Sequence, residues 1–238
     1  FFKSPSWIRY LVNTLILSFM NLIFYFPAPI ILALMLNEMR SLRYKKLLQT
    51  FLYVPHFISI VIVVSITMIL FGPSGIVYKV TQNVLGSPIN FLGSPNTFRW
   101  MIIGQSIWKE TGWGTIIYLA AISGIDPSLY ESAQVDGAGR LRRIWHITLP
   151  GISGTIAVLL ILAVGGLFSG SFDQAMMLGN SMNKTHSEII DVYVYEMGLS
   201  KQRYSYATAV GLFQSIISFV LVMAANWGSG KITGSALF

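Results

Sequence analysis

Five long apolar blocks, separated by polar loops, constrain the fold of this chain more than any other feature of its sequence. A helix needs roughly 20 apolar residues to cross a hydrocarbon core of about 30 Å. Only helices are expected, because in lipid every backbone polar group must be bonded within its own segment. The sequence therefore predicts an all-α, polytopic transmembrane helical bundle with five spans in this chain, at residues 10–36, 47–71, 98–123, 151–169 and 206–226.

The composition excludes several classes of function. Charged residues make up 11% of the chain, whereas a soluble domain has about 25%. The chain has no cysteine, which excludes disulfides, thiol catalysis and cysteine-bound metals. Its three histidines are far apart, so no metal site is expected. The net charge of +7 is carried by the loops, where it indicates membrane topology rather than nucleic-acid binding.

Two short loops hold dense groups of basic residues. The first inter-span loop and the third one lie on the same side of the membrane if all five blocks span it, and the positive-inside rule makes that side cytoplasmic. Because the chain starts neither like a translation start nor like a signal peptide, we expect it to begin within a longer protein. The basic residues are Arg40, Arg43, Lys45 and Lys46 in the first loop, and Arg140, Arg142 and Arg143 in the third.

The third loop, residues 124–150, has the signals of a short helix followed by a tight turn. Asp126 and Pro127 are suited to the N-cap and first position of a helix. Gly137 and Gly139 are suited to its C-terminal end, where a left-handed backbone is needed. A second short segment follows from Arg140. By itself this pattern favours an ordinary structured loop, although the small residues at its bend would also let the surface of another protein approach the backbone closely.

The residues of this loop resemble the EAA loop of ABC importer permeases. Glu131-Ser132-Ala133, Gly137 after three residues, and Ile147-Thr148-Leu149-Pro150 after nine more match the pattern of that family, with serine in place of one alanine. The resemblance implies one permease domain over residues 1–238 with a cytoplasmic coupling helix, which docks in a cleft of the ATPase subunit. The residues expected at that contact are Glu131, Ser132, Ala133, Gly137, Ala138 and Arg140.

Weaker motifs resemble the carbohydrate branch of these permeases, of the polysaccharide and complex-oligosaccharide type that includes alginate importers. They lie at residues 13–15, 49–57, 108–121 and 172–174. The resemblance implies a sixth span before residue 1, a second and related permease subunit, an ATPase dimer and an extracytoplasmic solute-binding protein. It also implies a place in the bacterial cytoplasmic membrane and transport by alternating access. No cofactor is expected in this chain, because ATP and Mg would be bound by the ATPase.

Lys109 and Glu110 lie inside the third apolar block, where an ionisable side chain costs about 2.5–3.5 kcal/mol. They could line the pathway, or the span could begin later and leave them at the outer headgroups. Asp173 and Gln174 could meet substrate at the outer mouth or belong to a solvated loop, and His56 is expected to be a hydrogen-bonded residue at a helix break. The possible pathway residues are Trp108, Lys109, Glu110, Trp113, Tyr118, Asp173 and Gln174.

Two other transport functions and one structural role are open to such a sequence. The same architecture could import amino acids, peptides or another small solute. A proton-coupled secondary transporter could use Lys109, Glu110 and Asp173 as a relay, although this gives no reason for the spacing in the third loop. A structural membrane anchor would leave the intramembrane charges unexplained. No phosphate-binding loop is present, so the chain is not expected to be an enzyme.

Overall fold

The computed structural model describes residues 5–168 and 171–233, and every element in these ranges is helical. The chain forms two compact units. The first contains Phe1–Asn21, Ile58–Ser106 and Gly166–Phe219, and the second contains Leu22–Phe57, Ile107–Gly165 and Val220–Phe238. Two long helices, α6 (Pro95–Ser123) and α14 (Tyr204–Thr233), contribute residues to both units.

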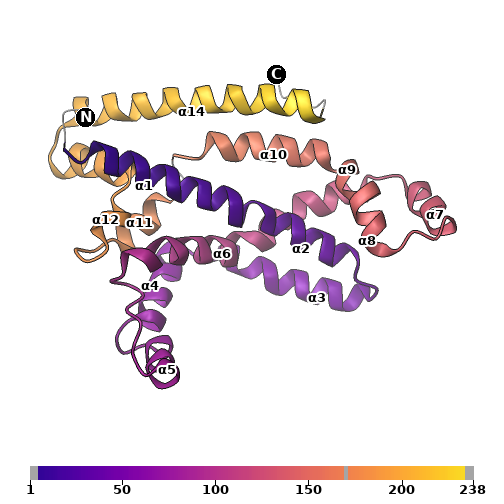
Figure 1. Ribbon diagram of the computed structural model, residues 1–238, viewed down its shortest axis with the longest axis horizontal. Coiled ribbons are helices and arrows are strands. Elements are labelled where there is room, and N and C mark those ends of the chain that lie inside the picture. Colours follow the sequence, from indigo (N-terminus) through magenta and orange to yellow (C-terminus); the bar gives the residue numbers. More distant parts are fainter. Residues whose placement is uncertain (1–4, 169–170, 234–238) are drawn as a thin grey trace. The chain divides into compact units, whose positions relative to one another are not determined.

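The first unit is held together by a chain of buried amide and hydroxyl groups. Gln105 donates a 2.7 Å hydrogen bond to Thr67, and Gln174 donates one of 3.2 Å to Gln105. These residues come from different helices, and α11 packs against α4 (Figure 1). The unit's other helices are α1 (Trp7–Met20), α4 (Ile60–Phe71), α5 (Ile76–Leu85), α11 (Phe172–Leu178), α12 (Lys184–Ser187) and α13 (Ile190–Tyr195).

The second unit has an apolar core formed by Ala33, Tyr118, Ile122 and Ile152, which are all buried. α2 (Pro27–Asn37), α6 and α10 (Ser153–Gly165) meet at this core. Figure 1 shows α7 and α8 at one end of this unit, beyond α9. The unit also contains α3 (Leu42–Tyr53), α7 (Pro127–Val135), α8 (Arg140–Arg143), the π-helical turn Ile144–Thr148 and α9 (Leu149–Gly151).

Within the described residues, three helical stretches are long and apolar enough to cross a membrane: Trp7–Asn37, Ile60–Leu85 and Tyr204–Lys231. A fourth is possible if Arg140–Gly151 and Ser153–Gly165, which are bent by 61° at their junction, count as one span. α6 has the length but not the apolarity of these stretches. A helical membrane chain is thereby confirmed with three to four candidate spans, and five spans stay a prediction.

The second expected span, residues 47–71, is wrong as a single helix. α3 ends at Tyr53, a 3₁₀ turn covers Val54–Phe57, and α4 starts only at Ile60. Pro55 explains the break, because proline has no N–H to continue the helical hydrogen bonds. A similar irregularity precedes Pro27, where a π-helical turn separates α1 from α2.

Candidate functional site

The loop of residues 124–150 begins as its sequence predicts. The Asp126 side chain accepts a 2.9 Å hydrogen bond from the Ser128 N–H, and Pro127 is the first residue of α7. This bond stabilises the carboxylate, which lowers the pKa of Asp126 below its ordinary value. The predicted N-cap is therefore confirmed.

A glycine-dependent C-terminal motif ends α7. The Gly137 N–H donates to the Gln134 carbonyl at 3.1 Å, and the Ala138 N–H donates to the Ala133 carbonyl at 2.8 Å. This pair of bonds is a Schellman motif, in which the residue after the cap has a left-handed backbone. Gly137 fills that position with φ of 75°. The glycine of the EAA-like pattern is therefore required by the local backbone.

Three contacts hold the base of the loop to the rest of the second unit. The Tyr130 hydroxyl lies 3.0 Å from the Thr148 hydroxyl, which links α7 to the π-helical turn. Gly151 lies against Ile125 so closely that an added Cβ would approach the isoleucine side chain to 2.7 Å. Arg140 lies 3.9 Å from Glu38 at the end of α2. Because Ile125 also packs against the Ala33 core, the loop is anchored to α2, α6 and α10.

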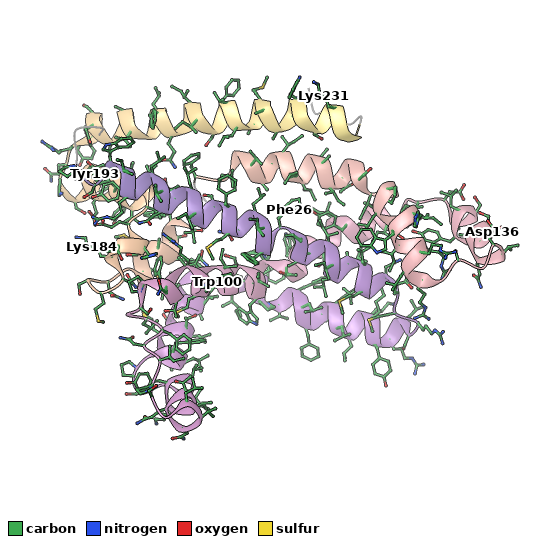
Figure 2. The ribbon with its side chains drawn as sticks, viewed as in Figure 1. Phe26, Trp100, Asp136, Lys184, Tyr193 and Lys231 are labelled. Carbon is green, nitrogen blue, oxygen red and sulfur yellow. The ribbon has the colours of Figure 1, made fainter. Side chains whose placement is uncertain are left out.

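The surface of this loop exposes apolar side chains that its own unit leaves uncovered. Val135 is 88% exposed and Leu141 is 72% exposed, and Leu129 and Trp145 are exposed as well. Figure 2 shows Asp136, next to Val135, at the tip of the loop. Of the residues expected at the ATPase contact, Ala133 and Ala138 are partly buried, and the exposed ones are Glu131, Ser132, Gly137 and Arg140.

Replacing Gly137 with alanine tests the role of its backbone. A left-handed conformation costs a non-glycine residue roughly 1–2 kcal/mol, which would speed local opening about five- to thirtyfold. Hydrogen exchange of the amides at the end of α7 should therefore accelerate by that factor. Gly139→Ala is the matched control, because Gly139 has φ of −65° and no atom within 4 Å of an added Cβ. Equal exchange in both variants would contradict this account.

Lys109 and Glu110 lie midway along α6 and form an ion cluster with His56 at the break after α3. Lys109 donates to the His56 carbonyl at 2.7 Å and to the Glu110 carboxylate at 2.8 Å. The other carboxylate oxygen lies 2.6 Å from His56 Nδ1. Only 12% of the Lys109 side chain is exposed, against 32% for Glu110. Lys109 thus bonds the His56 carbonyl, which the helix break leaves free. As expected, His56 is a hydrogen-bonded residue at a helix break.

Aromatic rings cover one side of the ion cluster. The His56 imidazole stacks on Trp113 with 4.4 Å between ring centroids and an interplanar angle of 3°. Phe57 meets the same indole edge-on at 5.7 Å, and both Phe57 and Trp113 keep exposed surface. Trp108 is exposed too, on the same helix as Trp113. This arrangement offers flat aromatic faces beside a group of charges that neutralise one another.

The remaining pathway candidates lie in different surroundings. Tyr118 is 3% exposed and belongs to the Ala33 core, so in this unit it is a packing residue. Gln174 is 5% exposed and bonded to Gln105, so the expectation of a solvated loop at this residue is wrong. Its neighbour Asp173 is exposed in the first turn of α11. The sequence interpretation passed over Arg99, whose signal was a lone charge at the start of an apolar block.

Comparison with known proteins identifies the family. The family described as "Binding-protein-dependent transport system inner membrane component" matches residues 11–231. The chain belongs to this family. The third loop predicted a permease subunit of an ATP-driven importer, and the family match and the relatives confirm that prediction. The family's description as an inner membrane component supports a place in the membrane.

Relatives of known sequence and structure match nearly all of this chain, which spans about 70–82% of their own length. Protein LplB of Bacillus subtilis (strain 168) is 50% identical over 100% of this chain and 75% of its own length. The polygalacturonan/rhamnogalacturonan transport system permease protein YteP of the same strain is 48% identical over 94% and 70%. A chain from the crystal structure of a bacterial ABC transporter involved in the import of the acidic polysaccharide alginate has a TM-score of 0.94, at 45% identity over 98% and 82%.

Proposed function

We propose that this chain is one of two permease subunits of an importer that carries oligosaccharides or polysaccharide fragments across the bacterial cytoplasmic membrane. The relatives named for polygalacturonan, rhamnogalacturonan and alginate support the carbohydrate class. The observation that carries the proposal is the loop of residues 124–150, an anchored and capped helix with uncovered apolar side chains. Exposed apolar surface of this kind is typical of protein contacts.

The ATPase dimer docks on this loop, and ATP with Mg is bound by the ATPase. Glu131 and the exposed face of α7 form the contact, with Gly137 and Ala138 at its end. When the ATPase dimer closes on ATP, α7 moves with it. The loop base and the Ala33 core share Ile125, so the movement reaches α2, α6 and α10. Packed cores transmit displacement instead of absorbing it, which would turn the bundle between inward-facing and outward-facing forms.

Trp108 and Trp113 line the pathway together with Lys109 and Glu110. Sugar rings have apolar faces that pack on aromatic rings, and a small number of polar groups orients the ligand. The bundle has five spans in this chain and one before it, and a second, related permease subunit completes the pathway. An extracytoplasmic binding protein delivers the substrate, as supported by the alginate transporter whose crystal structure includes its periplasmic protein bound to an alginate pentasaccharide.

Reconstitution in proteoliposomes tests this function. Uptake of labelled trigalacturonate is expected only when the partner permease, the ATPase, ATP and the binding protein are all present. Uptake of amino acids or peptides in place of the saccharide would favour the small-solute alternative. Uptake driven by a proton gradient with no ATPase present would contradict the proposal, and would assign Lys109 and Glu110 to a proton relay.

A further inference from the structure

Arg99 is a partly buried cation with an incomplete set of partners. Its guanidinium donates one 2.7 Å hydrogen bond, from Nη2 to the Asn13 amide oxygen. Its Nε is buried and has no hydrogen-bond partner. Across residues 5–168 and 171–233, no carboxylate forms an ion pair with it. A cation removed from water is normally paired with an anion, so Arg99 has capacity for an anionic ligand.

The neighbours of Arg99 cannot supply that anion. Asn13 uses its amide nitrogen on the carbonyls of Thr185 and Glu188, both at 2.9 Å, which holds its oxygen toward Arg99. The Glu188 carboxylate is already shared by Arg9 at 2.5 Å and Lys184 at 3.4 Å. Two permanent cations, Arg9 and Lys184, therefore share this one carboxylate. Lys184, labelled in Figure 2, is the first residue of α12.

The positive charge of Arg99 acts on a neighbouring titratable side chain, His186. Burial, together with the charge of Arg99, lowers the pKa of His186 below its ordinary value. His186 bonds through Nδ1 to the Thr185 hydroxyl at 3.0 Å. The second of these causes places the Arg99 guanidinium within electrostatic reach of His186.

We propose that Arg99 binds a carboxylate group of an acidic saccharide during transport. The inference rests on the proposed import of oligosaccharides and adds to it the acidic class of sugar. A guanidinium presents parallel N–H donors that match the two oxygens of a carboxylate, which favours this partner over a neutral hydroxyl. The local excess of positive charge from Arg9 and Lys184 would raise the concentration of anionic ligands there.

Transport of a saccharide and of its uncharged ester tests the assignment in the complete importer. The probes are trigalacturonate and its methyl ester, which has the same sugar rings without the charges. We expect Arg99→Gln to raise the KM for trigalacturonate at least about tenfold, since a hydrogen bond to a charged group is lost. Transport of the ester should stay within a factor of about two of wild type. Lys201→Gln, which removes an exposed cation of the same unit, should leave both unchanged.

Several outcomes would contradict the assignment of Arg99, and each points to a different explanation. An equal loss with both saccharides, or a weaker response to the unloaded binding protein, would mean that Arg99 pairs with an acidic side chain of that protein. Arg99→Lys keeps the charge and should give a smaller, still selective loss, which decides the matter if Arg99→Gln does not assemble. Wild-type behaviour of Arg99→Lys with trigalacturonate would overturn the proposal. Failure of the wild type with both saccharides would instead refute the carbohydrate function.

Discussion

Replacing Lys109 with methionine is expected to destabilise the purified chain by about 1.5–3 kcal/mol. The substitution leaves the His56 carbonyl at the helix break without its donor and the Glu110 carboxylate without its cation. Thermal unfolding in detergent, followed by intrinsic tryptophan fluorescence, measures the loss. An unchanged unfolding temperature would contradict the role given to this ion pair.

The double variant Lys109→Met/Glu110→Met separates stability from transport. Removing both charges leaves neither the Lys109 ammonium nor the Glu110 carboxylate without the other, so it should cost less than the sum of the two single substitutions. If Lys109 and Glu110 line the pathway, the double variant should recover stability and still transport poorly. Full transport by a stable double variant would assign the pair to structure alone.

Replacing Gly112 with alanine is expected to disrupt the packing of α3 on α6. An added Cβ would collide with the Leu52 carbonyl oxygen, a backbone atom that cannot rotate away. Overpacking of this kind costs about 1–3 kcal/mol, and occasionally more. Unfolding temperature and assembly with the partner subunits should both fall.

Gly104→Ala on the same helix is the matched control. No atom of the part of the chain that the structure describes lies within 4 Å of a Cβ added there, and alanine is more favourable than glycine in a helix by about 0.8–1 kcal/mol. This variant should be at least as stable as wild type. If Gly112→Ala were equally stable, the close approach of α3 to α6 would be wrong.

The sequence predicted best those features whose interactions are local. Asp126, Pro127 and Gly137 act through partners within five residues, so their residue types alone indicated the start and end of α7. The EAA-like pattern could also be recognised from the sequence, because all of its residues lie within one loop. The contact between His56 and Glu110 spans 54 residues, and no local pattern could indicate it.

The sequence of a membrane helix does not show which way each side chain points. When most of a helix is apolar, periodicity does not separate a core-facing residue from one that lines a pathway. Tyr118 and Gln174 were among the candidate pathway residues, and in their own units both are buried. Hydropathy likewise joined residues 47–71 into one span, although Pro55 interrupts the helix.

Coupling of transport to ATP hydrolysis through Glu131 tests the central claim most directly. In the reconstituted importer, ATP hydrolysis stimulated by the loaded binding protein is compared between wild type and Glu131→Ala. The Glu131 side chain is exposed and forms no hydrogen bond or ion pair within residues 5–168 and 171–233, so the variant should fold normally. The account predicts that it loses most of the stimulated hydrolysis and of saccharide uptake. Undiminished saccharide uptake by this chain without any ATPase subunit would contradict it.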